Sequence, residues 1–257
     1  MRYHKVICLL ILAVLSAGLY PVAFKDGEKL TFKVKYGIVS AGEAVLEAKS
    51  SSYQGNPVWH LSTTAKTYSF FDPFFKVRDR VESWWDKQTL LPYKFSKTLQ
   101  EGNYRQHRIH TFDQAGRSTY YQKWSYKTDT WTNETQALPF DTQDMLSAFY
   151  EVRNRNLKPG AAVTVNITSD GRSVPTEIAV HRRERASTIF GTVDCLVIEP
   201  RVKSEAIFKQ SGNILIWVTD DDYKIPVKLQ SAVTFGSFIA ILTDARNVPY
   251  SIKNPAK

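Results

Sequence analysis

Cysteine is scarce in this sequence, and its scarcity excludes a disulfide-stabilised fold. The 257 residues include two cysteines, Cys8 in an apolar run near the start and Cys195 further along. Val193, Cys195 and Val197 occupy alternate positions and so lie on one side of a predicted buried strand. We expect Cys8 to leave with a signal peptide, so that Cys195 stays a buried strand thiol and no intrachain disulfide forms.

Long hydrophobic runs are also missing. The longest candidate, residues 6–15, has ten apolar residues, whereas a membrane-spanning helix needs roughly 20. Arg2 and Lys5 precede it and Ser16-Ala17-Gly18 follows it, which is the layout of a secretory signal peptide. We predict a signal peptide over residues 1–18, with cleavage as late as residue 23. Because Cys8 comes too early to carry a lipid, we expect a soluble periplasmic protein and no lipoprotein.

Catalytic signatures are absent from the sequence. It contains no Gly-x-Ser-x-Gly elbow, no HExxH motif and no phosphate-binding loop. His107 and His110 fall in a predicted strand, where their spacing puts them on opposite faces. The run 220–222 of three aspartates lacks the spacing of a calcium loop and indicates a solvated turn. We therefore expect no metal ion and no cofactor, and the sequence identifies no catalytic residue.

Acidic residues are outnumbered by basic ones, and the formal net charge is +9. Loss of Arg2 and Lys5 with the signal peptide would leave about +7, that is 9 − 2. Such a balance favours anionic surfaces, for example phospholipid head groups, lipopolysaccharide or acidic glycans, although ordinary solubility explains it equally well. Nucleic acid fits poorly with export. Apolar residues make up 43% of the chain, which excludes disorder and suffices for a sizeable core.

Period-two patterns dominate the chain. Leu30, Phe32, Val34 and Tyr36 alternate with polar residues, which predicts a half-buried strand. About a dozen segments of this kind follow, separated by turn residues such as Gly102. Without a βαβ rhythm, a parallel nucleotide-binding sheet is excluded. We predict a predominantly all-β fold over residues 24–250, a single antiparallel domain forming a barrel, half-barrel or wrapped sheet.

One helix is expected, over residues 141–156. This segment lacks glycine and proline, and its apolar residues recur at helical spacing. Asp141 or Thr142 can cap its start, and Pro159-Gly160 stops it.

Short motifs spread along nearly the whole predicted domain carry a family resemblance. They are Gly27-Glu28-Lys29-Leu30, Tyr36-Gly37 and Ala41-Gly42; Asp79, Glu82-Ser83, Asp86, Leu91-Pro92, Phe95, Glu101-Gly102 and Tyr104; Asp144, Leu146-Ser147, Tyr150, Arg153 and Leu157-Lys158-Pro159-Gly160; and Trp217, Asp221 and Ile225-Pro226-Val227. The chain thereby resembles the bacterial family called domain of unknown function 3108. The resemblance implies an exported envelope protein with an antiparallel β architecture. The family has no established activity, so no catalytic residue carries over. The expected shape is also similar to periplasmic half-barrel carriers of lipoproteins and lipids.

One loop is unusually aromatic: Phe70 and Phe71, then Asp72-Pro73, then Phe74 and Phe75. Loops are normally polar, because their backbone is hydrated. In one interpretation the loop folds over an open end of the barrel and plugs the core. In the other it forms the mouth or lid of a site for a hydrophobic ligand, or dips into a bilayer surface.

We expect a non-catalytic, monomeric envelope protein that binds an apolar or amphipathic ligand, such as a lipid or lipoprotein, in a concave β surface. The candidate ligand-binding residues are Phe70, Phe71, Phe74, Phe75, Trp84 and Trp85. Two alternatives stay open. One is a glycan- or protein-binding scaffold that uses exposed Trp84, Trp85, Trp124 and Trp131, since aromatic faces bind sugar rings. The other is an enzyme with an unrecognised pair of carboxylates.

Overall fold

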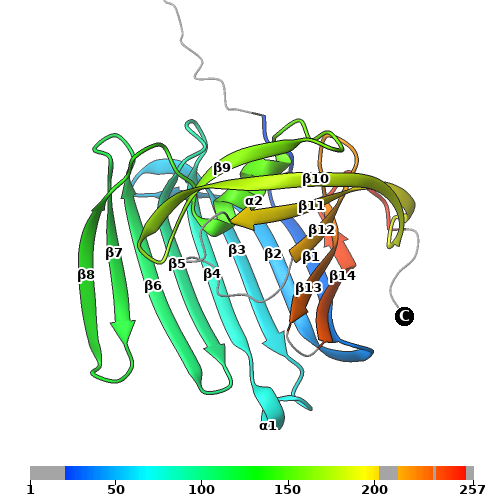
Figure 1. The fold of residues 1–257 in the computed structure, drawn as a ribbon, viewed down its shortest axis with the longest axis horizontal. Coiled ribbons are helices and arrows are strands. Elements are labelled where there is room, and N and C mark those ends of the chain that lie inside the picture. Colours follow the sequence, from blue (N-terminus) through cyan, green and yellow to red (C-terminus); the bar gives the residue numbers. More distant parts are fainter. Residues whose placement is uncertain (1–20, 203–213, 234–235, 253–257) are drawn as a thin grey trace, which may run out of the picture.

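The computed structural model describes residues 21–202, 214–233 and 236–252, so the predicted signal peptide over residues 1–18 lies outside the described residues. The described part forms fourteen strands and two helices (Figure 1). They are, in chain order, β1 (Glu28–Tyr36), β2 (Val39–Tyr53), β3 (Asn56–Thr67), α1 (Asp72–Phe75), β4 (Arg78–Asp86), β5 (Pro92–Glu101), β6 (Tyr104–Asp113), β7 (Ser118–Ser125), β8 (Thr130–Ala137), α2 (Met145–Arg153), β9 (Ala162–Ser169), β10 (Arg172–Thr188), β11 (Gly191–Val202), β12 (Ile214–Thr219), β13 (Pro226–Val233) and β14 (Gly236–Arg246). The expected predominance of strands is confirmed. Neither helix is long and apolar enough to span a bilayer, as far as the described residues go.

All fourteen strands belong to one antiparallel sheet, ordered β8-β7-β6-β5-β4-β3-β2-β1-β14-β13-β12-β11-β10-β9. Every pair of neighbouring strands but one is also consecutive in sequence. The exception lies in the middle, where β1 pairs with both β2 and β14, and Val34 lies opposite Ala240. The first and last strands therefore join the two halves of the sheet.

The sheet wraps without closing, which confirms the predicted wrapped antiparallel architecture. Its edge strands β8 and β9 are consecutive in the chain, and residues 138–144 with α2 pass between them. At one side of this gap Leu138 donates its N–H to Arg117 O at 2.8 Å. At the other side Gln143 forms a parallel bridge with Ile167 of β9. In Figure 1, β9 to β11 cross over one end of the β1–β7 strands, with α2 beneath them.

Helix α2 starts later than the sequence predicts, at Met145 instead of near residue 141. Its N-cap is Asp144, whose carboxylate accepts from the N–H groups of Leu146 and Ser147 at 2.8 and 2.9 Å. Ser147 completes a capping box, because its hydroxyl accepts from the Asp144 N–H at 2.9 Å. Residues 141–143 are held outside the helix because Gln143 pairs with β9.

We call the sheet face covered by α2 the inner face and the opposite one the outer face. On the inner face the helix residues Leu146 and Tyr150 pack with Leu61, Trp85 and Phe95 in one buried cluster. A second cluster joins the helix to β9–β12 and includes Ala148, Val152, Val165, Ile178, Leu196, Ile198 and Ile216. Helix α2 thus fills the curved inner face of the sheet at the strand ends near which the helix lies.

A buried ion pair fixes the end of α2 to β1. Arg153 and Glu28 are each 1% exposed, and the guanidinium donates to both carboxylate oxygens at 2.7 and 2.9 Å. The same guanidinium donates to Ala23 O at 3.0 Å and to Tyr223 O at 3.1 Å. These four bonds satisfy a charge that would otherwise be costly to bury.

Replacement of Glu28 by glutamine should therefore destabilise the protein strongly, because it leaves the buried Arg153 charge without its counter-charge. We expect the free energy of unfolding to fall by about 3 kcal/mol or more in urea denaturation followed by tryptophan fluorescence. The adjacent Lys29 pairs with Glu47 on the exposed outer face, and Lys29→Gln should cost less than about 1 kcal/mol. Equal losses for the two variants would contradict this role of the buried pair.

Candidate functional site

The inner face is filled near α2 and hollow at the other strand ends. Leu30 of β1 and Leu61 of β3 are fully buried, whereas Val34 and Ala65, further along the same strands, are only half-buried. Direct cross-strand partners lie on one face of a sheet, so Val34, Gly42 and Ala240 share this inner face. These strand ends lie on the side of the sheet from which α1 projects (Figure 1), and we call them the α1 rim: the turns β1–β2, β3–β4, β5–β6 and β7–β8, with the start of β14.

A hollow of about 540 Å³ opens at the α1 rim. Its lining is mainly apolar and consists of Val34, Tyr36, Ala41, Gly42, Ala65, Phe71, Phe75, Val77 and Phe238, with Glu43, Lys66, Thr67 and Glu101. Tyr36 and Phe238 are opposite each other on β1 and β14, and their ring centroids are 5.1 Å apart. These two rings line the hollow where the halves of the sheet meet.

Helix α1 and the two residues before it contain the four predicted phenylalanines, which fall into two pairs. Phe71 and Phe75 line the hollow. Phe70 and Phe74 do not, and they are 75% and 78% exposed. The structure therefore brings two of the predicted residues to the hollow and directs the other two into solvent.

Local polar contacts explain why this short segment turns as it does. Pro73 stands in the first turn of α1, where its missing N–H is not needed. The Asp72 carboxylate accepts from the Thr67 hydroxyl at 2.6 Å and from the Arg78 guanidinium at 2.5 Å, which together lower the pKa of Asp72. The Phe75 ring lies against Gly102 of the β5–β6 turn, where even a methyl group would come within 2.8 Å of it.

Two acidic side chains line the inner face beside the hollow. Burial raises the pKa of Asp79, whose carboxylate accepts from the Gln100 N–H at 2.9 Å. Burial and the neighbouring Asp79 raise the pKa of Glu101 as well. Lys97, on the same face of β5, does not neutralise these two acids, because its ammonium pairs with Asp170 and lies 3.0 Å from both carboxylate oxygens. Lys66 and Glu43, which also line the hollow, pair with each other at 3.4 Å, so the remaining polar edge is acidic.

A second apolar hollow, of about 290 Å³, lies between α2 and strands β9–β13. Among its lining residues are Phe149 of α2, Ile198 of β11, Ile216 of β12 and Leu229 of β13. Leu229 is opposite Ala240, which in turn is opposite Val34 in the first hollow. The two hollows thus share the apolar inner face and are separated by β14.

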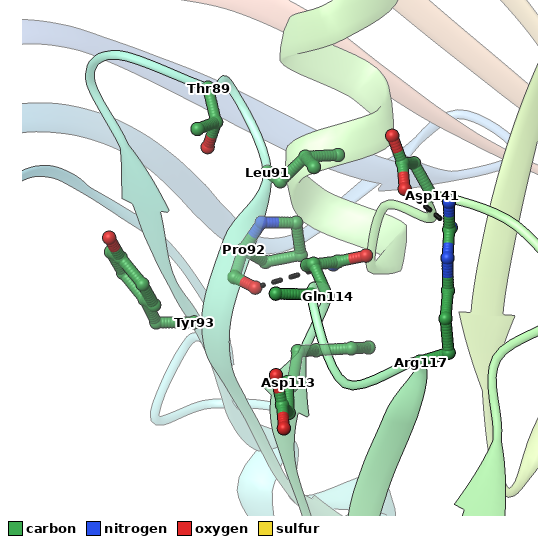
Figure 2. A pocket seen from close by; sticks show the side chains of 10 residues that line it. Thr89, Leu91, Pro92, Tyr93, Asp113, Gln114, Arg117 and Asp141 are labelled. Carbon is green, nitrogen blue, oxygen red and sulfur yellow. Dashed lines mark hydrogen bonds and ion pairs between the residues drawn. The ribbon is translucent and has the colours of Figure 1, made fainter.

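A more polar pocket of about 450 Å³ lies at the opposite strand ends (Figure 2). Its polar groups already satisfy one another: Arg117 pairs with Asp141 at 2.5 Å, and the Gln114 amide donates to Thr142 O at 2.9 Å. These bonds attach residues 141–142 to the sheet, so the pocket has a sufficient structural explanation.

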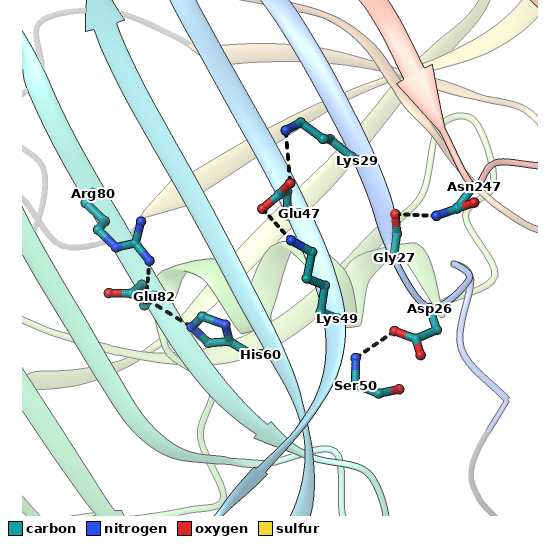
Figure 3. A network of polar contacts seen from close by, with 10 residues as sticks. All are labelled: Asp26, Gly27, Lys29, Glu47, Lys49, Ser50, His60, Arg80, Glu82 and Asn247. Carbon is teal, nitrogen blue, oxygen red and sulfur yellow. Dashed lines mark hydrogen bonds and ion pairs between the residues drawn. The ribbon is translucent and has the colours of Figure 1, made fainter.

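The outer face carries a network of charges (Figure 3). Glu47 lies between Lys29 and Lys49 at 3.1 and 3.2 Å, and Glu82 lies between Arg80 and His60 at 2.7 and 3.0 Å. Figure 3 shows these side chains in front of the sheet and α2 behind it. This face is a solvated surface of alternating charge.

The predicted tryptophans lie away from the hollow. Trp85 is fully buried in the core, where its indole N–H donates to Leu90 O at 2.7 Å and to Gln143 Oε1 at 3.0 Å. Trp84 is on the outer face, with the Lys94 ammonium 5.0 Å from its ring centroid. Trp84 and Trp85 thus point to opposite faces, and neither joins Phe71 and Phe75.

The sequence also predicts the surroundings of Cys195, His107 and His110. Cys195 is fully buried, and burial raises the pKa of its thiol to about 12, as suits a strand thiol. His107 contacts Trp131 on the outer face and His110 is buried on the inner face, as their spacing predicts. Within the described ranges no three His, Cys, Asp or Glu side chains gather in an arrangement that could hold a metal ion.

Comparison with known proteins gives a family and a fold. The chain matches a family described as "Protein of unknown function (DUF3108)" over residues 31–243. No curated protein matches. Among solved structures it is similar to a β-barrel-like protein of domain of unknown function DUF1849 from Brucella abortus, with a TM-score of 0.56 and 10% identity over 89% of this chain and 100% of that one. A candidate lipoprotein from Parabacteroides distasonis, 10% identical over 88% of this chain and 98% of its own, has a TM-score of 0.35. The similarity to the Brucella abortus protein indicates a shared fold only, and the TM-score of the Parabacteroides distasonis protein is too low to indicate one.

The raised pKa of Glu101 has a consequence for stability. The folded protein holds a proton at Glu101 more tightly than the unfolded chain does, so stability is lost as the pH rises through the raised pKa. Glu101→Gln should increase the free energy of unfolding at neutral pH, by up to about 1 kcal/mol because solvent screens this half-buried pair. The difference should vanish in acid, where both carboxyls are protonated. Urea denaturation at both pH values, with the exposed Glu134→Gln as control, checks this; a stabilisation that persists in acid would contradict it.

Proposed function

This chain belongs to the DUF3108 family of proteins of unknown function, and from that premise we propose that it is an exported, non-catalytic binding protein. Its ligand is an apolar or amphipathic molecule, and the hollow at the α1 rim holds the apolar part. Phe71, Phe75, Tyr36 and Phe238 form the contact surface. Export to the periplasm rests on the signal-peptide pattern of residues 1–18.

The observation that carries this proposal is an apolar interior that the described residues do not fill. Protein cores are close-packed, and unfilled apolar space costs stability. Here one end of the inner face is packed by α2, while the other retains about 540 Å³ of apolar hollow. That volume falls within the roughly 300–1,000 Å³ typical of small-molecule sites. A ligand that enters the hollow would cover the half-buried Val34 and Ala65.

The acidic edge of the hollow favours one class of head group. Asp79 and Glu101 accept hydrogen bonds when ionised and repel another carboxylate. An amphiphile with a hydroxyl or amine head group fits this edge, and a fatty acid does not. Both acids lie on one wall and interact with each other. Glycoside hydrolysis needs two carboxyls that flank the scissile bond, so this arrangement supports binding over catalysis.

The direct test uses two matched pairs of substitutions in and just before α1. Phe71→Ser with Phe75→Ser removes rings that line the hollow, and Phe70→Ser with Phe74→Ser removes rings that do not. A neutral fluorescent naphthylamine probe should bind the unaltered protein with saturation. The first pair should weaken its binding by about tenfold or more, since two apolar contacts are lost, and the second by less than about twofold. Absence of saturable binding, or equal effects of the two pairs, would refute the proposal.

The head-group preference has its own measurement. At neutral pH a fluorescent alkylamine should bind more tightly than the fatty acid with the same fluorophore and chain length, because an acidic edge favours a cationic head group over an anionic one. Glu101→Gln should reduce this preference, and Glu134→Gln, at an exposed site on β8, should leave it unchanged. A fatty acid that binds better than the amine would contradict the predicted head-group class.

A second candidate, glycan binding on the outer face, has one observation in its favour. Trp131 is 37% exposed and packs edge-on against Trp124 and His107, with ring centroids 5.3 and 4.9 Å away. Aromatic faces of this kind stack on sugar rings. Retention of the protein on a polysaccharide or peptidoglycan column, lost on Trp131→Ala and kept in the Phe71→Ser/Phe75→Ser protein, would favour this candidate over the first.

A further inference from the structure

Exposed hydrophobic side chains are concentrated at the α1 rim. Fourteen large hydrophobic side chains are exposed in the described part of the chain, and ten of them lie at this rim. The ten are Tyr36, Ile38, Val39, Tyr68, Phe70, Phe74, Phe75, Tyr104, Tyr126 and Phe238. They come from four different turns and the start of β14, so one sequence segment does not account for the cluster. A patch of this kind on a protein surface marks an interaction site.

Three of these side chains extend furthest into solvent. Ile38, in the β1–β2 turn, is 95% exposed, and Phe70 and Phe74 beside α1 are 75% and 78% exposed. The two turns are adjacent, because Tyr68 donates its N–H to Ala41 O at 3.0 Å. Figure 1 shows α1 projecting beyond the strand ends of the sheet. The fold thus presents apolar side chains at a protruding end, where they cover no part of the core.

Among the exposed charged side chains at this rim, Lys66, Lys76, Arg105 and Lys127 outnumber the carboxylate of Asp129. The acidic residues Glu43 and Asp72 are neutralised by Lys66 at 3.4 Å and Arg78 at 2.5 Å. Lys76 follows α1 directly, and Lys127 and Asp129 lie in the β7–β8 turn. All three are exposed, and none forms an ion pair with any described residue. Apolar side chains at the tip with lysines behind them are the arrangement that binds an anionic membrane surface.

We propose that the α1 rim docks on an anionic phospholipid bilayer. Phe70, Phe74 and Ile38 enter the boundary between head groups and acyl chains, and Lys76 and Lys127 contact the phosphates. A partner protein would need a matching concave surface, whereas a bilayer accepts side chains presented from several separate turns. The docking itself does not depend on the proposed function. Docking would also give the proposed ligand a route to its site. Because the hollow opens at the same rim, an amphiphile could pass between bilayer and hollow without crossing water.

Vesicle co-sedimentation tests the docking with the purified protein. It should bind vesicles of phosphatidylcholine with phosphatidylglycerol, bind pure phosphatidylcholine more weakly, and lose affinity as salt is added. Phe70→Ser with Phe74→Ser should weaken binding to the anionic vesicles by about tenfold or more, since the transfer of two phenylalanine side chains is lost. Tyr120→Ser removes an exposed aromatic residue away from the rim and should leave binding unchanged.

Three outcomes would overturn the proposal. The first is that the unaltered protein does not bind vesicles, and the second is that the Phe70→Ser/Phe74→Ser protein binds them as tightly as the unaltered protein does. The third is a rim covered by a second copy of the chain: a dimer in analytical ultracentrifugation that these substitutions dissociate, without vesicle binding. Probe binding in the absence of vesicles, measured on the same proteins, separates this result from that of the proposed function. A protein that binds vesicles and no probe would retain the docking and lose the ligand.

Discussion

The position of helix α2 inside the curl of the sheet is the constraint on which the other features depend. Both ends of the helix are fixed by buried polar contacts. At its start the Asp144 carboxylate accepts from the Ser83 hydroxyl of β4 at 2.6 Å, and at its end Arg153 pairs with Glu28 of β1. A helix held in this way cannot slide toward the α1 rim to fill it. One end of the inner face is consequently a packed core, and the other is an apolar surface that no element of the described chain covers.

The α1 rim combines two properties that are unfavourable for a folded chain in water: an unfilled apolar hollow and exposed aromatic side chains around its opening. Residues 70–75 connect them, because Phe71 and Phe75 line the hollow whereas Phe70 and Phe74 face the solvent. A chain that gained nothing from these residues could replace Phe70 and Phe74 with polar ones at little cost to its core. Their presence is best understood through a ligand and a surface that cover them.

Much of this architecture follows from local patterns in the sequence. Alternation along residues 29–36 predicts strand β1 and the face that Leu30 and Phe32 bury, and the spacing of His107 and His110 places them on opposite faces. The partners of a strand do not follow from such patterns, because period two fixes a face and leaves the neighbour open. Pairing of β1 with β14 joins segments about 200 residues apart, so the contact of Tyr36 with Phe238 could not be predicted. Likewise, the aromatic content of residues 70–75 singles out that loop, but the division of its rings depends on the Asp72 contacts with Thr67 and Arg78. Helix α2 begins late because Gln143 pairs with β9, a tertiary contact that overrides local propensity.

The central pairing of β1 with β14 also determines when the fold can be completed. The strands of every other neighbouring pair are consecutive in sequence, so each pair can form as soon as both of its strands have been synthesised. The β1–β14 pair can form only after nearly the whole chain has been synthesised. Until then the β1–β8 and β9–β13 segments are separate half-sheets whose central edges, β1 and β13, are unpaired. Such edges associate readily with other strands. The chain is thus exposed to misassembly until its last strand arrives, and a chaperone that covers free β edges would act during this interval.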